Sequence, residues 1–298
     1  MFIQAKVITL SAKITSMTTS EQKLFPGTTF ISTILDAADI KASMSRNFSS
    51  VYLMRAGMAG FLIGIFYLAN FSVISAFVQA GPDLVGVGRL AGAIVFGFAL
   101  VFIYYTKSEL LTSNMMITTI AVYYHKLKLG RGTLVMMLCF LGNFLGGLII
   151  ATLMHFSTLL AGPTGELVQA AVDHKLEYVT SGASGMLDLF VRAILCNFMI
   201  NIAMLLIYNG FVHNDGVKVI AMVVSVVLFA FLGFEHSVAN TVLFTVEALQ
   251  HGIPIFPAIG NIAIALVGNF VGGGLLIGWY YAYANDAGFH LRRHPTIK

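Results

Sequence analysis

The chain alternates long apolar stretches with short polar connections. Four uncharged apolar stretches, 56–77, 132–156, 193–212 and 256–284, are each long enough to cross a hydrocarbon core, which takes about 20 helical residues. This pattern predicts four uninterrupted membrane-spanning helices.

Two further apolar stretches are interrupted by polar residues. The stretch 90–124 is broken by the sequence KSE at 107–109. The stretch 219–246 is broken by Glu235 and His236. Each could form two short helices or one span followed by a re-entrant half-helix, since non-helical backbone is tolerated at membrane depth only where it is buried in protein or lines a polar cavity. Either arrangement predicts six spanning units in total.

The segment 30–44, FISTILDAADIKASM, has a different pattern. Its apolar residues recur at helical intervals, at Ile31, Ile34, Leu35, Ala38 and Met44. This spacing predicts an amphipathic helix, either on the membrane surface or against neighbouring helices. We therefore expect a cytoplasmic N-terminal segment at 1–50, a six-helix transmembrane domain at 51–285 and a cytoplasmic C-terminal tail at 286–298.

Composition supports the membrane assignment. Hydrophobic residues make up 58% of the chain and charged residues only 10%, whereas soluble domains average about 45–50% and about 25%. The net charge of +4 then reflects unequal loops rather than a nucleic-acid surface. Cys139 and Cys196 both lie in apolar stretches, which predicts neither a disulfide framework nor a metal site. We expect no cofactor.

The basic residues predict the orientation. If the N-terminus is inside, most of the 17 Lys and Arg residues fall in segments that face the cytoplasm, as the positive-inside rule requires. Residues 1–25 lack a compact apolar core with a cleavage site, which argues against a cleaved signal peptide. We expect a multi-pass protein of the cell membrane with both termini in the cytoplasm.

An internal repeat relates the two interrupted stretches. The segment LGNFLGG at 141–147 recurs 126 residues later as VGNFVGG at 267–273. The same offset places Glu109 on Glu235 and Asn114 on Asn240. The small residues alone could reflect ordinary close packing of membrane helices, but that does not explain why Glu and Asn recur at both interruptions in one register.

The repeat unit contains three spans, so its second copy must start from the opposite side of the membrane. The two halves are then inverted repeats whose second and fifth helices are broken at matching positions. Transporters with this organisation hold their substrate site near the midplane, where the broken helices meet. The pattern thus favours an all-α transporter whose pathway passes between the two breaks.

At this point the residues resemble a known family. The segments GFEHSVAN at 233–240, SELLTSN at 108–114 and ILCN at 194–197, with the two GNF-GG segments, are similar to those of formate/nitrite transporters. The resemblance implies an aquaporin-like protomer with its own pore, assembled as a homopentamer. It also implies small monovalent anions as substrates, chiefly formate and nitrite, and the SEL and LCN variants lie nearer to the nitrite branch.

The resemblance implies roles for individual residues. His236 corresponds to the central pore histidine, and Thr112 to the threonine that faces it from the other break. Asn197 corresponds to the asparagine of the fourth span, and Lys175 is the candidate for the vestibule lysine. The residues that correspond to the apolar constrictions are Phe96, Leu100, Leu110, Leu111, Ile200 and Phe229.

The remaining polar residues at the breaks have a structural interpretation. We expect Glu235 to hold backbone N–H groups at its break rather than to line the pore, because a fixed carboxylate would repel an anion. Glu109 is its counterpart in the repeat, and Asn114 and Asn240 complete the two breaks.

Elementary electrostatics shows why a central histidine would suit anion transport. An anion that enters a narrow apolar constriction loses its hydration, which disfavours the charged form. Crossing as the neutral acid then becomes competitive, and a histidine can supply a proton or a hydrogen bond near neutral pH. We therefore expect protons to participate in transport.

Two alternatives remain. A channel for small neutral solutes shares the inverted-repeat plan, but neither break contains the Asn-Pro-Ala motif of such channels. A membrane enzyme could use Glu235 and His236 as an acid/base pair, yet neighbouring residues on a helix point about 100° apart. No nucleophile motif accompanies them, so anion transport is the favoured interpretation.

Overall fold

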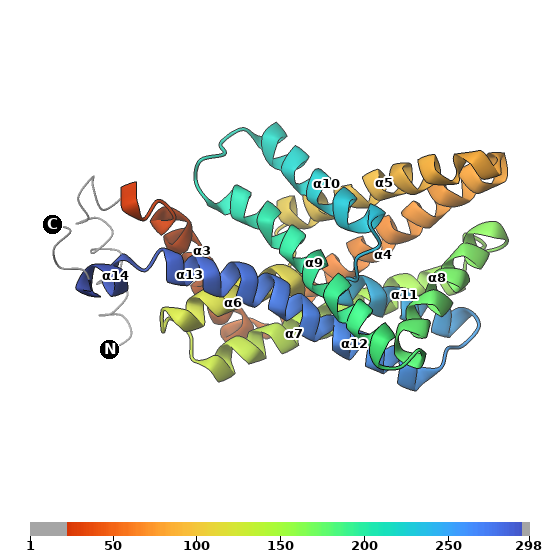
Figure 1. Cartoon of the computed structure of the whole chain (residues 1–298). Coiled ribbons are helices and arrows are strands. Elements are labelled where there is room, and N and C mark those ends of the chain that lie inside the picture. Colours follow the sequence, from red (N-terminus) through yellow and green to blue (C-terminus); the bar gives the residue numbers. More distant parts are fainter. Residues whose placement is uncertain (1–22, 294–298) are drawn as a thin grey trace.

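The computed structural model describes residues 23–293, and every element in this range is helical (Figure 1). The parts of the predicted terminal segments at 1–22 and 294–298 lie outside the described residues. The first half of the chain forms helices α3 (Thr28–Asn47), α4 (Ser49–Ala80), η1 (Pro82–Leu84), α5 (Val85–Tyr105), α6 (Leu111–Tyr123) and α7 (Leu129–His155). The second half forms helices α8 (Pro163–Thr180), α9 (Ala183–Tyr208), α10 (Asp215–Phe231), α11 (Ser237–Gln250), α12 (Ile255–Asn269), η2 (Phe270–Trp279), α13 (Tyr280–Ala284) and α14 (Ala287–Arg293).

Five of the described helices are long and apolar enough to cross a membrane. They are Ser49–Ala80, Pro82–Tyr105, Leu129–His155, Ala183–Tyr208 and Ile255–Ala284. Helix α10 has 17 residues, and we expect it to complete a sixth unit together with α11. The predicted all-α membrane fold with broken second and fifth helices is confirmed, while the count of six spans stays a prediction.

The two broken stretches differ in form. Helix α5 is long enough to span on its own, so α6, with 13 residues, is a half-helix added after it. Helices α10 and α11 have 17 and 14 residues, so here the break lies between two shorter pieces. Both arrangements that the sequence allowed are therefore present, one in each half.

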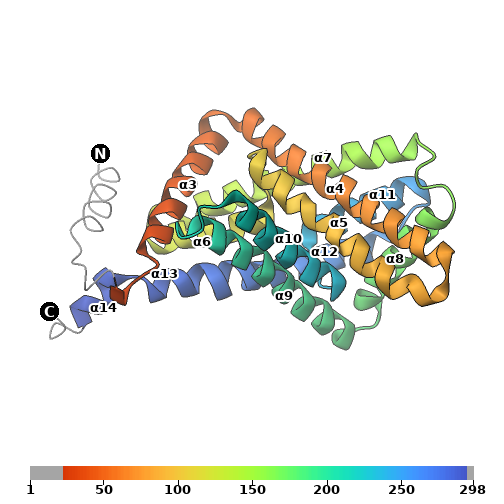
Figure 2. The same cartoon turned by 90° about the horizontal axis from the view of Figure 1, so that it is seen from above.

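Each half-helix packs against the other half of the chain. Helix α6 contacts α9 and η2, whereas α11 contacts α4 and α7. Helices α5 and α10 also lie against each other. This exchange brings the two breaks, far apart in sequence, to one place in the middle of the molecule (Figures 1 and 2).

The repeated glycines explain the close packing of the long helices within each half. A Cβ atom on Gly146 would lie 1.8 Å from the Gly57 carbonyl oxygen of α4. A Cβ atom on Gly272, its counterpart in the repeat, would lie 2.1 Å from the Ile194 carbonyl oxygen of α9. Both contacts are far shorter than any side chain allows, so the repeated GNF-GG segments lie at helix crossings that require glycine.

The predicted amphipathic helix is α3, and it packs against neighbouring helices. Its predicted apolar residues Ile31, Ile34, Leu35 and Ala38 are buried, in contact with α4, α6, α7 and α9. The Gly27 N–H that precedes it donates to Asn285 Oδ1 at 2.8 Å. As a result, α3 and α14 lie at the same end of the molecule (Figures 1 and 2).

Helix α8 was not predicted from the sequence. It precedes the second half as α3 precedes the first, and it lies at the opposite end of the molecule from α3 (Figures 1 and 2). Its sequence PTGELVQAAVDHKLEYVT mixes apolar and charged residues, so it contains no apolar stretch of the kind that marks a span. Each half of the inverted repeat is therefore three predicted spans preceded by one amphipathic helix.

Candidate functional site

The two breaks have the same backbone geometry. Leu110 immediately precedes α6 with φ −104° and ψ 128°, and His236 immediately precedes α11 with φ −107° and ψ 113°. Both residues are extended, and they are equivalent in the repeat. The residues that the 126-residue offset pairs in the sequence are therefore also equivalent in the structure. At this position the first half has a leucine where the second half has a histidine.

Two asparagines hold the breaks, and sequence reasoning did not single them out. Asn143 Oδ1 accepts the Leu111 N–H at 3.1 Å, and its Nδ2 donates to the Glu109 carbonyl at 2.8 Å. Asn269 makes the same pair of bonds to the Ser237 N–H at 2.9 Å and the Glu235 carbonyl at 2.9 Å. Both are the Asn of the repeated GNF segment, so the repeat contained the signal.

Glu235 has different partners from those predicted. Its two carboxylate oxygens accept hydrogen bonds from Lys175 Nζ, each at 2.8 Å, and Oε2 also accepts from Asn240 Nδ2 at 2.6 Å. None of these bonds comes from a backbone N–H group, because the N–H of Ser237 at the break already donates to Asn269 Oδ1. The expectation that Glu235 binds backbone amides was therefore wrong, although its structural role at the break remains.

The pair of Lys175 and Glu235 is almost fully buried, with side chains 9% and 4% exposed. Burial disfavours the Lys175 ammonium, but the facing carboxylate of Glu235 more than offsets this and raises the pKa of Lys175 above its usual value. Lys175 therefore stays protonated at neutral pH, and it forms with Glu235 an ion pair that has no net charge.

The first break has an equivalent pair. Lys41, on α3, forms an ion pair with Glu109 Oε2. The same oxygen accepts from Asn114 Nδ2 at 3.1 Å, just as Glu235 accepts from Asn240. Sequence reasoning gave α3 no role at the breaks and missed Lys41. The two lysines come from equivalent amphipathic helices, which neither the offset nor local sequence revealed.

His236 caps α11 and faces the other break. Its Nδ1 accepts the backbone N–H groups of Val238 and Ala239 at 3.1 and 3.3 Å. Because a backbone N–H can only donate, Nδ1 carries no proton, and the neutral ring must carry its hydrogen on Nε2. That Nε2–H donates to Thr112 Oγ1 at 3.3 Å. The structure thus brings together the two residues that the resemblance paired.

Asn197 and its neighbour Asn201 position the start of α6. The Nδ2 atoms of both side chains donate to the Thr112 carbonyl at 3.2 Å. Asn197 Nδ2 also donates to the Asn269 carbonyl at 2.7 Å, so it holds the start of α6, from the first half, against α9 and α12 of the second half. Asn197 was predicted as a site residue, whereas Asn201, one helical turn later, was not.

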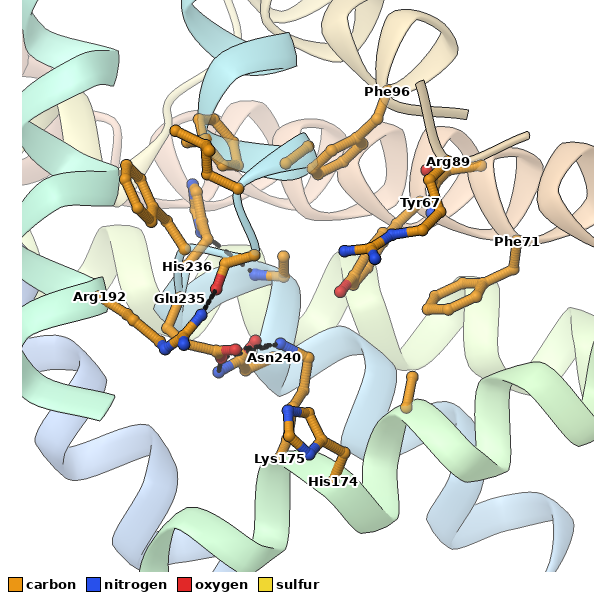
Figure 3. Close-up of a pocket in the computed structure, with 18 of the residues that line it drawn as sticks. Tyr67, Phe71, Arg89, Phe96, His174, Lys175, Arg192, Glu235, His236 and Asn240 are labelled. Carbon is orange, nitrogen blue, oxygen red and sulfur yellow. Dashed lines mark hydrogen bonds and ion pairs between the residues drawn. The ribbon is translucent and has the colours of Figure 1, made fainter. Parts of the chain in front are cut away.

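Two cavities approach this centre from opposite directions. The first, which we call the α8 cavity, has a volume of about 320 Å³ and is lined by residues that include Tyr67, Arg89, Phe96, Lys175, Arg192, Phe229, Glu235 and His236 (Figure 3). The second, which we call the α3 cavity, has a volume of about 200 Å³ and is lined by residues that include Lys41, Leu100, Glu109, Leu110, Ser113 and Asn114. Glu235 therefore does line a cavity, contrary to the prediction, and its charge is balanced there by Lys175.

A thin apolar barrier separates the two cavities. Phe96 lines the α8 cavity, whereas Leu100, one turn further along α5, lines the α3 cavity. One turn of helix is about 5.4 Å long. The Phe96 ring packs against the Phe229 ring at 6.0 Å between centroids, and Leu110 lines the α3 cavity.

Two of the predicted constriction residues do not line the cavities. Leu111 and Ile200 are buried, 2% and 1% exposed, and line neither of these two cavities. Leu111 begins α6, and its N–H is fixed by Asn143. Their place in a constriction stays a prediction.

The family model described as "Formate/nitrite transporter" matches residues 28–283 of this chain. The formate channel FocA of Haemophilus influenzae is 30% identical over 226 residues, covering 66% of this chain and 75% of that protein. The nitrite transporter NirC of Escherichia coli (strain K12) is 26% identical over 246 residues, covering 82% of this chain and 87% of that protein.

Solved structures show the same fold. An "FNT family ion channel" superposes with a TM-score of 0.74 at 23% identity, covering 86% of this chain and 98% of that chain. A "pentameric formate channel with formate bound" superposes with a TM-score of 0.64 at 21% identity, covering 80% and 97%. At these identities the similarity establishes the architecture.

Proposed function

Because this chain belongs to the formate/nitrite transporter family, we propose that it carries small monovalent anions, formate or nitrite, through a pore within each protomer. Members of the family are channels and transporters. The protein is therefore a multi-pass membrane protein and not an enzyme, which removes the acid/base interpretation of Glu235 and His236.

One observation supports this proposal above the others. The Nε2–H of His236 donates to Thr112 Oγ1 at the point where the two breaks meet, beside the barrier between the two cavities. It is a hydrogen-bond donor on the path of an anion that has just lost its hydration. An anion oxygen that reaches the barrier can replace Thr112 Oγ1 as its acceptor.

The protonation of the anion follows from the same geometry. Within the apolar barrier the charged form of the substrate is disfavoured, so a proton on the anion lowers the cost of crossing. In its resting state His236 has one hydrogen, on Nε2, and its Nδ1 caps α11. The neutral ring thus acts as a hydrogen-bond donor. It can give up the Nε2 proton only after a second proton has bound to Nδ1, which breaks the hydrogen bonds from the Val238 and Ala239 N–H groups.

The assembly and orientation of the protein are further parts of the proposal. Similarity to a pentameric channel supports a homopentamer. The basic residues of the loops support an N-terminus in the cytoplasm, and α3 and α14 lie at one end of the molecule. We place the α3 cavity on the cytoplasmic side of the cell membrane and the α8 cavity on the outer side.

Uptake into proteoliposomes tests the function. Vesicles that contain the protein should take up labelled formate or nitrite faster than empty vesicles. They should not swell in glycerol, since swelling would indicate a channel for neutral solutes. His236→Asn should remain folded and lose the normal pH response of uptake. His213→Asn, in an exposed connection between α9 and α10, is the matched control and should transport as the wild type does. Equal uptake by empty and loaded vesicles would rule the proposal out.

A further inference from the structure

The α8 cavity contains several cations whose charges are not equally available. Arg89, Lys175 and Arg192 all line it, whereas Glu235 is the one carboxylate among its lining residues in the described chain. Lys175 uses both oxygens of that carboxylate. The lysine that the family resemblance pointed to is therefore neutralised within the cavity.

Arg192 is also neutralised. Its Nε donates to Asp188 Oδ1 at 2.9 Å, and its Nη1 donates to the Gly233 carbonyl at 3.0 Å. Asp188 is one helical turn away on α9 and does not line the cavity. The charge that Arg192 presents to an approaching anion is therefore opposed by a carboxylate in direct contact with it.

Arg89 is different. Between residues 23 and 293, no carboxylate forms an ion pair with its guanidinium, and within the same range the guanidinium makes no hydrogen bond. The residue is exposed near the start of α5. Figure 3 shows its side chain beside Tyr67, extending toward the middle of the cavity, with no dashed line to it.

From this distribution of charge we propose that Arg89 supplies the positive field that draws substrate anions into the α8 cavity, and that Lys175 does not. A neutral ion pair acts at a distance only as a dipole, whose field falls off faster than that of a single charge. Clefts lined with unbalanced charge raise the local concentration and the association rate of an oppositely charged ligand. This inference rests on the proposed anion transport and names the residue that captures the anion.

The inference makes a prediction that depends on salt. Arg89→Gln should lower uptake at low substrate concentration about three- to tenfold, because one charge supplies part of the 10–10³-fold effect of a charge-lined cleft. The loss should be largest at about 0.01 M ionic strength, where the Debye length is about 30 Å, and should vanish near 1 M, where it is about 3 Å. The rate at saturating substrate should not change.

Two further variants separate charge from other effects. Arg89→Lys keeps the charge and should retain wild-type uptake at low salt. Arg46→Gln removes the same kind of charge from an exposed position on α3, outside the cavity, and should have no effect. Labelled formate is the probe, and the mass of each solubilised variant is measured to verify assembly.

The outcomes are distinct. Uptake by Arg89→Gln that equals the wild type at low salt would overturn the inference. A loss that persists unchanged near 1 M salt, or that Arg89→Lys shares in full, would also overturn it, because the role would then be steric. A wild-type protein that transports none of the anions would refute the proposed function itself, whatever Arg89 does.

Discussion

Removing one member of the buried pair between Lys175 and Glu235 should destabilise the protein far more than removing both. Glu235→Gln keeps the shape of the side chain and an acceptor for Asn240, but it leaves the Lys175 ammonium buried without a counter-charge. Breaking a buried ion pair in this way costs about 3–5 kcal/mol. The two side chains are only 9% and 4% exposed, so solvent screens little of this cost.

The double variant Glu235→Gln with Lys175→Met removes both charges. Replacing a buried ion pair by apolar or neutral groups of similar size is often neutral, so the double variant should recover most of the stability. The coupling energy between the two substitutions should be about 3 kcal/mol or more, well above the 0.5 kcal/mol or so that separates additive from coupled sites.

Thermal unfolding of the solubilised oligomer measures the effect. The single variant should lose at least about 6 °C, since each 1 kcal/mol corresponds to about 2–4 °C in a chain of 150–250 residues. The same cycle on Lys41 and Glu109 is the internal control, and its coupling should be smaller because the Lys41 side chain is more exposed, 14% against 9%. A double variant whose losses are the sum of the two single losses would refute the reasoning.

Three other predictions concern the two breaks and the helix packing around them. The carboxylate partner of Lys175 raises the pKa of this lysine. The stabilisation that follows from this shift is therefore complete below the unfolded pKa of about 10.4 and is lost only as the pH rises above it. The difference in stability between the wild type and the double variant should thus be constant from about pH 6 to about pH 9. Thr112→Val leaves the Nε2–H of His236 without its acceptor and should cost about 1–3 kcal/mol in unfolding experiments, whereas Thr112→Ser should not. Gly272→Ala should lower the unfolding temperature by an overpacking cost of at least about 1–3 kcal/mol, while Gly130→Ala, with nothing within 4 Å of the added Cβ, should leave it unchanged.

Much of the fold could be predicted because its signals are local. Apolar stretches define the spans by their length, and charged residues inside them, such as Glu109 and Glu235, are so costly in a membrane that they mark a break. The starts of the helices that follow both breaks agree with the sequence to within one residue, since α6 begins at Leu111 and α11 at Ser237. The offset of the repeat also predicted which residues would be equivalent in space.

The candidate site could be predicted in part. The family resemblance named His236 and Thr112, and the structure brings them into contact. The resemblance also named Lys175, but nothing in the sequence showed that Glu235 neutralises it. Glycine-rich packing faces obscured the role of Asn143 and Asn269, which were seen as members of a repeat and not as the residues that hold the breaks.

The sequence by itself determined a membrane protein of two related halves with two breaks, because length, hydrophobicity and periodicity act along the chain. The tertiary structure alone decided which charges are free. Helices α3 and α8 carry Lys41 and Lys175 to the breaks, although 68 and 60 residues separate each lysine from its glutamate. Pairings over such distances depend on how α3 packs against α6 and how α8 packs against α11, and no local pattern encodes that packing.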